Sequence, residues 1–282
     1  MLHPRLTLFG VGFLLISGCL LCAETASAQF DKLDNLASEI TKELKPLKPH
    51  LVAVVDFRPP DGSTMPQAHY FAAIFSSCLE DRANHKFAVA NHKAFDSDLE
   101  KLQISLQSLV PGSENFRSAA SHIGADVLLT ATIEKRNGSY VLAVTPVRLA
   151  GGKVLATHSQ TIAASDFLDS FITPFPENVA HADNKHEDEM ERITMPRCVR
   201  CPDPSYNDLA RRNKVNGVSV MEVLISPAGV AQQIRPVRLL GYGLDEEAYD
   251  VIKKWKFRPA TLKADGTAVP AIVMVEVTFR LY

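Results

Sequence analysis

The sequence lacks the common signatures of catalytic sites. It has no Gly-rich phosphate-binding loop, no Gly-x-Ser-x-Gly nucleophile elbow and no His-Glu-x-x-His zinc motif. These absences exclude the usual P-loop nucleotidases, α/β-hydrolases and zincin metalloproteases. Because His and Asp residues are dispersed without any informative spacing, the sequence predicts a protein that is not an enzyme and that binds no cofactor.

An excess of positive charge is also missing. Lys and Arg number 30 against 32 Asp and Glu, which leaves a net charge of −2. A general nucleic-acid binder is therefore excluded, because such proteins neutralise phosphates with a basic surface. The hydrophobic content of 46% over 282 residues is instead typical of a globular protein with two ordinary domains.

Charge is absent from residues 6–23, which follow Arg5. Three interpretations remain open for residues 1–28. The run is a cleaved export signal that ends at the small-x-small site before the Ala28–Gln29 bond. It is a lipoprotein signal, because Ile-Ser-Gly-Cys resembles a lipobox and would place a lipid on Cys19. Or it is a retained membrane anchor, since its helical length of roughly 27 Å barely spans a bilayer core. All three predict an exported, cell-envelope, periplasmic protein with membrane association in two of the cases.

Hydrophobic spacing divides the next part of the chain. Residues 31–46 show apolar positions at helical intervals and end at a proline, which predicts an amphipathic helix. Residues 50–172 predict an α/β domain with a mixed sheet, which begins with the buried strand Leu-Val-Ala-Val-Val. Its "Ile-Gly-Ala-Asp, then apolar strand" segment at 123–130 resembles the envelope domains of curli-secretion and flagellar outer-membrane lipoproteins. That resemblance implies an exported scaffold or assembly module.

Residues 173–201 predict a linker, because proline and a charged run leave little apolar surface to bury. Its Cys198-x-x-Cys201 pair favours a structural disulfide in an oxidising compartment. Free thiols, metal binding and redox catalysis are the alternatives, and a zinc site would need a second pair that the sequence lacks. The acidic and His residues at 181–187 match no metal-site spacing and indicate a solvated segment.

Residues 202–282 carry the most informative pattern. Two strand-like runs, 218–225 and 231–239, flank a Pro-Ala-Gly turn. A helix follows, with the acidic triplet 245–247 in its first turn, where negative charge favours the helix dipole. The last strand alternates, with Val273, Val275, Val277 and Phe279 on one face. We expect a small domain in which a helix packs on an antiparallel sheet, so that the whole chain is α+β.

This segment resembles the TonB C-terminal domain family. The features that carry the resemblance are Pro204-Ser205-Tyr206, Gly217, Ile225–Gly229, Leu244–Ala248 and Trp255-Lys256-Phe257-Arg258-Pro259-Ala260. Of these, Trp255 and Phe257 are expected to fill the core between helix and sheet, and Pro259 to stop the helix. The family resemblance implies a domain that adds an extended peptide from an outer-membrane transporter to a sheet edge, here near Val273–Phe279.

Two features depart from an energy transducer of that family, which usually has an anchor helix and a long Pro-rich spacer. A domain stands where the spacer is expected, and the apolar run has no proton-handling residue. The sequence therefore predicts an envelope protein that binds other proteins and does not bind nucleic acid. Two roles remain open. The protein supports energy-coupled outer-membrane transport, or it is a structural lipoprotein or periplasmic adaptor. The oligomeric state also remains open.

Overall fold

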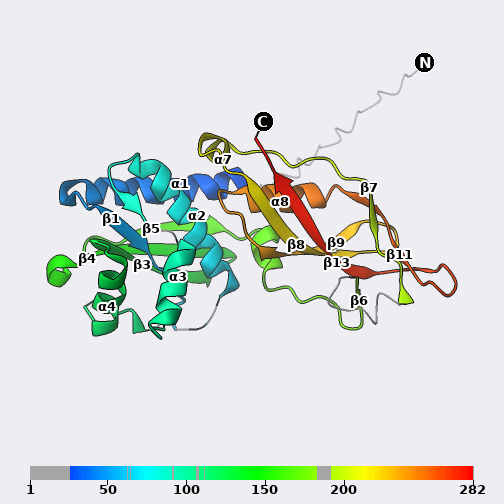
Figure 1. Cartoon of the computed structure of the whole chain (residues 1–282), viewed down its shortest axis with the longest axis horizontal. Coiled ribbons are helices and arrows are strands. Elements are labelled where there is room, and N and C mark those ends of the chain that lie inside the picture. The colour runs from blue at the N-terminus through cyan, green and yellow to red at the C-terminus, as the bar shows by residue number, and fades with distance from the viewer. Residues whose placement is uncertain are drawn as a thin grey trace, which may run out of the picture.

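The protein has two lobes joined side by side along its length (Figure 1). The structure is a computed structural model that describes residues 26–61, 63, 65–90, 92–105, 108–110, 112–182 and 192–281. Helices and strands occur in both lobes, which confirms the expected α+β class. Residues 1–25, with Cys19 and the apolar run, lie outside the described part.

A mixed five-stranded sheet forms the N-terminal lobe, with strand order β2-β1-β3-β4-β5. Strand β1 is parallel to β2 and β3, and β3, β4 and β5 are antiparallel neighbours. The Asn137-Gly138 turn, with both residues at positive φ, joins β3 to β4. The strands are β1 (Leu51–Val54), β2 (Ala88–Val89), β3 (Val127–Arg136), β4 (Ser139–Arg148) and β5 (His158–Ala163).

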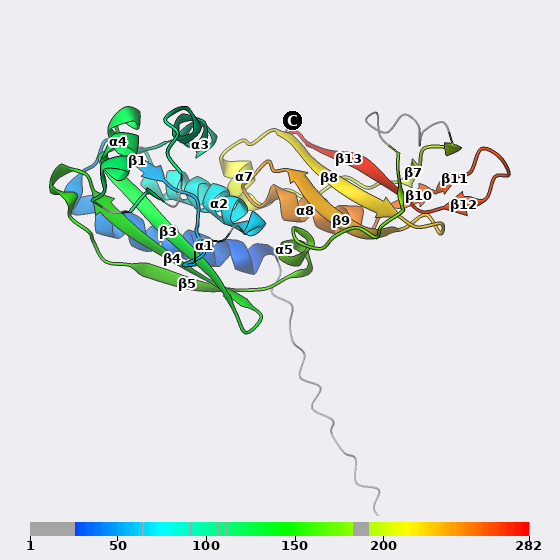
Figure 2. The ribbon, with the colours of Figure 1, turned by 90° about the horizontal axis from the view of Figure 1, so that it is seen from below.

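Helices cover both faces of this sheet (Figure 2). Val52 and Val54 of β1 face one apolar cluster, which also contains residues of α1 and α2, whereas Ala53 and Val55 face a second cluster with residues of α3 and α4. The continuous apolar sequence of β1 is therefore explained by burial on both sides. The helices are α1 (Ala26–Leu44), η1 (Lys45–Leu47), α2 (Pro66–Ala83), α3 (His92–Lys101), α4 (Glu114–Ile123), η3 (Ala150–Gly152) and α5 (Asp166–Ser170).

The C-terminal lobe is built on a sheet of order β6-β13-β8-β9, with α8 packed on one face. Strands β8, β9 and β13 are antiparallel, and β6 lies parallel to the start of β13. Two small ribbons, β10-β7 and β11-β12, extend from this sheet. The elements are β6 (Ala180–His181), β7 (Arg197–Arg200), α7 (Asp208–Arg212), β8 (Gly217–Ile225), β9 (Ala231–Arg238), α8 (Leu244–Ile252), β10 (Lys256–Arg258), β11 (Ala260–Thr261), β12 (Ala268–Val269) and β13 (Ala271–Phe279).

The segment 173–201 differs from the solvated linker that its composition predicts. Its described residues contribute β6 and β7 to the C-terminal lobe, and Ile193, which is buried, forms a bridge with Leu262. Composition averages over the whole segment, whereas pairing needs only a few residues beside an open strand edge. Short stretches of a polar segment, here Ala180–His181 and Arg197–Arg200, can therefore pair as strands where such an edge is within reach.

One apolar cluster runs through both lobes. It joins α1 and α2 of the N-terminal lobe to β8, α8 and β13 of the C-terminal lobe. At the junction, the rings of Phe167 in α5 and Tyr249 in α8 meet edge to face at 5.5 Å. Around it, the Tyr242 hydroxyl donates to Glu80 and the Arg212 guanidinium pairs with Asp81. The lobes are thus packed against each other through a shared core.

Among the described residues, no helix combines the length and the apolar content that a membrane crossing requires. Helix α1 has its apolar face on the core, with Leu33, Leu36, Ile40 and Leu44 buried. It lies against α2 and β5. It is therefore a structural element of the N-terminal lobe.

Glu246 is a buried carboxyl group on α8. The sequence predicts a first-turn carboxylate that favours the helix dipole, but only 5% of the residue is exposed, and its Oε2 has no hydrogen-bond partner among the described residues. It shares a helix face with Tyr249, three residues on, which contacts the N-terminal lobe. Burial, reinforced by the nearby Glu247 and Asp250, raises the pKa of Glu246 from 4.5 to about 8.

We predict that Glu246→Gln stabilises the protein at pH 8 and has little effect at pH 4.5. Between these values the folded protein retains a proton that the unfolded chain releases, so the free energy of unfolding falls as pH rises through this window. The amide has no proton to lose. Thermal unfolding across this pH range should show a gain in Tm on the order of 5–10 °C at the alkaline end. Equal Tm differences at both pH values would contradict this account.

Candidate peptide-binding edge of the C-terminal lobe

Strand β13 has one satisfied edge and one open edge. It pairs with β8 over its full length, from Ala271 opposite Ile225 to Phe279 opposite Gly217. On the other side, β6 pairs with Ala271 and Ile272 only. Within the described residues, the stretch 273–279 has no strand on this outer side. Seven residues of edge backbone, about 23 Å long, are therefore open to a further strand.

The pairing with β6 shows which backbone groups point outward. The Ala182 amide donates to the Ile272 carbonyl over 2.8 Å, so the polar groups of Ile272 face the outer edge. Because backbone direction alternates along a strand, the N–H and C=O groups of Met274, Glu276 and Thr278 also face outward. The groups of the intervening residues face β8 and belong to its ladder.

The side chains of β13 alternate in burial. Val273, Val275, Val277 and Phe279, which the sequence proposes as the binding edge, are buried against the core. A partner strand at the outer edge would instead lie beside the exposed side chains of Met274, Glu276 and Thr278. The alternation in the sequence contains this signal, since positions between core-facing residues of an edge strand face solvent.

Of the family-signature residues, Trp255 lies between α8 and β10, Phe257 lies in β10, and Pro259 follows it. Their aromatic rings pack against the core from its margin and do not fill it as expected. Trp255 and Phe257 are only half-buried, and their ring centroids lie 6.0 Å apart. Pro259, also half-buried, ends β10, and the fully buried member is Ala260. The core below α8 is filled instead by Leu244, Ala248, Val251 and Ile252. The helix supplies enough apolar surface by itself, so the rings remain at its margin.

Gly229 explains the Pro-Ala-Gly turn before β9. It has φ of +74°, and a Cβ there would lie 2.0 Å from the Phe257 carbonyl oxygen. The Phe257 amide donates to the Gly229 carbonyl over 2.8 Å. The turn therefore fixes β10 against the hairpin, and only glycine fits both the backbone angle and the space.

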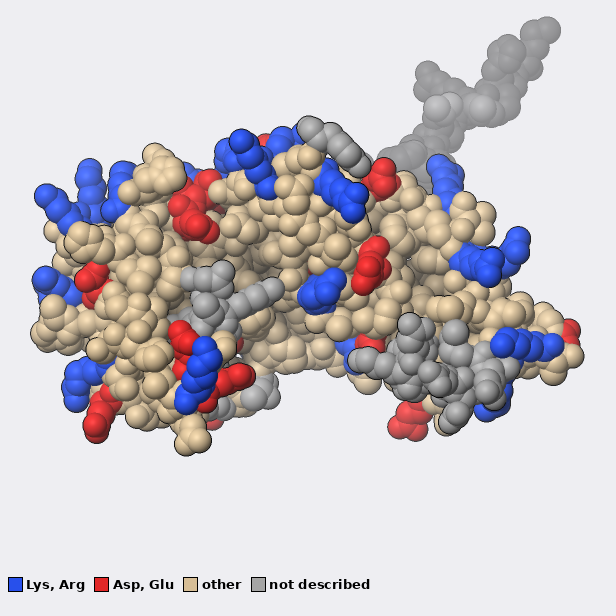
Figure 3. All heavy atoms as spheres, viewed as in Figure 1, with Lys and Arg blue, Asp and Glu red and all other residues tan. Residues whose placement is uncertain are grey.

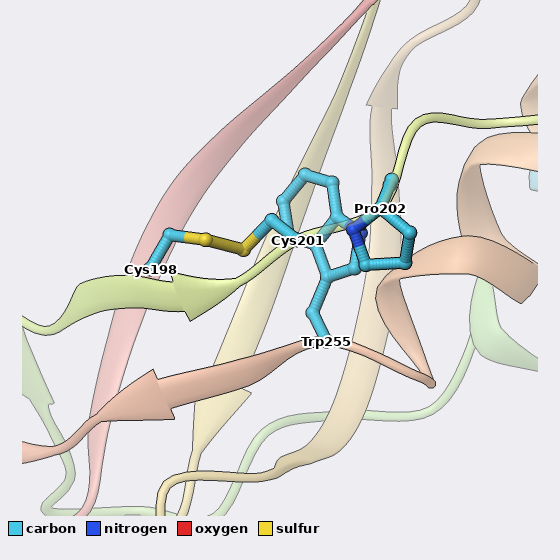
Figure 4. The surroundings of a disulfide bond; sticks show 4 residues. All are labelled: Cys198, Cys201, Pro202 and Trp255. Carbon is cyan, nitrogen blue, oxygen red and sulfur yellow. A yellow bond between two sulfur atoms is a disulfide. The ribbon is translucent and has the colours of Figure 1, made fainter.

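The CxxC pair lies on the surface beside this turn. Cys198 and Cys201 are joined by a disulfide with a Cα–Cα distance of 6.1 Å, and Cys198 belongs to β7. The Trp255 indole N–H donates to the Pro202 carbonyl over 2.9 Å, next to the disulfide (Figure 4). Cys78 is a free, buried thiol whose pKa is raised by burial, and it is therefore a core residue.

Asp245 organises the start of α8 in a way that sequence reasoning missed. It is fully buried, and its carboxylate accepts hydrogen bonds from the Ser219 hydroxyl at 2.6 Å and from the Leu240 and Gly241 amides at 2.9 and 2.8 Å. These bonds tie the helix to β8 and to the loop before the helix. The sequence predicts an acidic first turn but contains no sign that the carboxylate reaches back to a strand.

A family model described as Gram-negative bacterial TonB protein C-terminal matches residues 202–281. The match confirms the resemblance of this segment to the TonB C-terminal domain. The chain matches none of the curated proteins.

The chain is also similar to parts of several solved structures. The LpoB C-terminal domain of Salmonella enterica is 16% identical, with a TM-score of 0.39, and the match covers 48% of this chain and 98% of that one. Lipoprotein GNA1162 of Neisseria meningitidis is 15% identical, with a TM-score of 0.32 and coverage of 42% and 82%. The Pseudomonas aeruginosa TonB C-terminal domain is 18% identical, with a TM-score of 0.26 and coverage of 31% and 88%.

We predict that Asp245→Asn destabilises the protein by about 1–3 kcal/mol, because the amide of the new residue would point a donor at groups that are themselves donors. Asp250→Asn, an exposed change in the same helix, should alter the free energy of unfolding by less than about 0.5 kcal/mol. Urea denaturation of both variants measures the difference. Equal effects would show that the Asp245 hydrogen bonds contribute no net stability.

Proposed function

We propose that this protein is a non-enzymatic component of the cell envelope that binds an extended segment of another protein along the outer edge of β13. The observation that supports the proposal most strongly is the open backbone of residues 273–279 beside a fully paired inner edge. The TonB-type family match of the lobe that contains this edge agrees with it. A partner strand would gain main-chain hydrogen bonds in the manner of β-augmentation.

The short strand β6 is an internal example of such addition. It pairs in parallel with β13, and its chain contributes the Ala182 amide to the Ile272 carbonyl. A partner that continues along the same edge would meet the outward groups of Met274, Glu276 and Thr278. Because main-chain pairing carries most of this contact, the partner sequence is constrained mainly at positions beside these three side chains.

The finer proposal concerns the partner and its purpose. Following the family resemblance, we assign the partner as the extended periplasmic segment of an outer-membrane transporter. The packing of the two lobes on a shared core favours an adaptor that presents this edge at a fixed place over a transducer that reaches through a free spacer. A structural lipoprotein in which the N-terminal lobe does the main work is the second candidate.

We predict that Glu276→Pro abolishes partner binding while Glu276→Ala leaves it within about threefold of the wild type. Proline removes the N–H of residue 276, which points to the outer edge. Glu276 lies opposite Val220, but its backbone groups face away from β8. The substitution therefore leaves the hydrogen bonds between β13 and β8 intact. The measurement is photo-crosslinking in the native envelope from a benzoylphenylalanine at Met274, followed by mass spectrometry of the adduct.

The matched control carries the photoreactive residue at the exposed Lys153 of the N-terminal lobe. An adduct with an outer-membrane transporter that appears from position 274, is absent from position 153 and disappears with proline supports the proposal. Crosslinking that persists in the proline variant would show that the partner contacts side chains rather than the β13 backbone.

We predict that the protein from its native envelope has an intact mass corresponding to a chain that begins at Gln29. The apolar run that ends at Ala26-Ser27-Ala28 motivates this expectation. A diacylglyceryl adduct on Cys19 would assign the lipoprotein alternative, and a full-length mass would restore the anchored transducer. Intact-protein mass spectrometry separates the three results directly.

A further inference from the structure

The ribbon formed by β7 and β10 contains a bulge that changes which side chains share a face. Arg258 pairs with Arg197 and Phe257 with Cys198, but Lys256 pairs with Arg200, so that Val199 is the extra residue. Residues opposite each other project from the same face, and residues two apart on a regular strand do so as well. Arg197, Arg200, Lys256 and Arg258 therefore all lie on one face.

This face, the basic ribbon face, is an unusual concentration of charge. All four side chains are exposed, and Lys and Arg side chains project from the surface around β7 in Figure 3. None of them forms an ion pair with any residue that the structure describes. Two pairs of cations lie directly across the ribbon, an arrangement that opposes strand pairing.

Other contacts hold the ribbon together against this repulsion. The disulfide joins Cys198 and Cys201 across the bulged position, and the Trp255 indole bonds to Pro202 (Figure 4). On the opposite face, Phe257 lies across from Cys198, and its amide is bonded to Gly229. A constrained ribbon that keeps together four cations without an ion-pair partner in the described part of the chain is suited to an anionic partner.

We propose that the basic ribbon face binds an extended acidic segment of a partner protein that adds alongside β7. Within the described residues β7 is an edge strand, so its outer backbone groups are open to pairing. An added strand would lie about 4.8 Å away and place alternate carboxylates beside Arg197 and Arg200. Guanidinium groups match carboxylates in geometry, and the backbone edge favours a polypeptide over a lipid surface. This site is separate from the β13 edge and does not depend on it.

The test uses fluorescence polarisation with a labelled peptide of alternating Glu and Thr, and a Gln-Thr peptide for comparison. The protein as isolated from its native envelope should bind the acidic peptide about tenfold or more tightly than the neutral one, with affinity falling as NaCl rises. The variant R197Q/R200Q/K256Q/R258Q should lose this preference. This variant should be at least as stable as the wild type, because the opposing cations are removed. Thermal unfolding followed by circular dichroism checks its stability.

The matched control is K42Q/K86Q/R148Q/K153Q, which removes four exposed cations from the N-terminal lobe and should keep the preference. Cys198→Ser with Cys201→Ser should weaken binding of the acidic peptide, because the bulge that aligns Arg200 loses its covalent clamp. Equal loss in both quadruple variants would overturn the proposal by showing a general charge effect. Binding to phosphatidylglycerol vesicles without any preference for the acidic peptide would overturn it in favour of a membrane surface.

Discussion

The C-terminal lobe depends on the ladder between β13 and β8. Nine consecutive residue pairs fix the register, and a shift by one residue would turn the valines of β13 from the core to solvent. Because that ladder occupies one edge and α8 covers one face, the remaining surfaces of β13 are its outer edge and its exposed side chains. The candidate site therefore lies where it does because the valines of β13 must face the core.

The same ladder determines what supports α8. Ser219 of β8 holds the Asp245 carboxylate, which in turn accepts the amides of Leu240 and Gly241. The helix start is thus attached to the central strand by polar bonds and to the N-terminal lobe by the Tyr249 contact with Phe167. The buried charge of Asp245 is stabilised by three donors. Glu246, one residue on, has no partner for Oε2 in the described part of the chain and resists ionisation.

Sequence periodicity predicts much of this fold. The apolar run of β1, the Asn-Gly hairpin and the alternation of β13 each reflect a local rule, and the α+β class follows from them. Sequence reasoning proposes this strand as the candidate edge through Val273, Val275, Val277 and Phe279, whose side chains the structure places in the core. Which backbone edge stays open depends on the contact between β6 and Ala271–Ile272, a tertiary pairing between segments about 90 residues apart. The bulge opposite Lys256 and the buried Glu246 are likewise set by packing, and composition carries no sign of either.

The packing of the lobes bears on how a bound partner would be used. A domain at the end of a free spacer can follow a moving partner, whereas here the apolar cluster continues from α2 into α8 and β13. Separating the lobes would expose this surface to water and leave Tyr242, Glu80, Arg212 and Asp81 without their contacts. A pull on a strand bound at β13 would therefore be transmitted to the N-terminal lobe as well as to the C-terminal lobe. Under the proposed function, this mechanical continuity means that the N-terminal lobe would determine where the edge of β13 is presented.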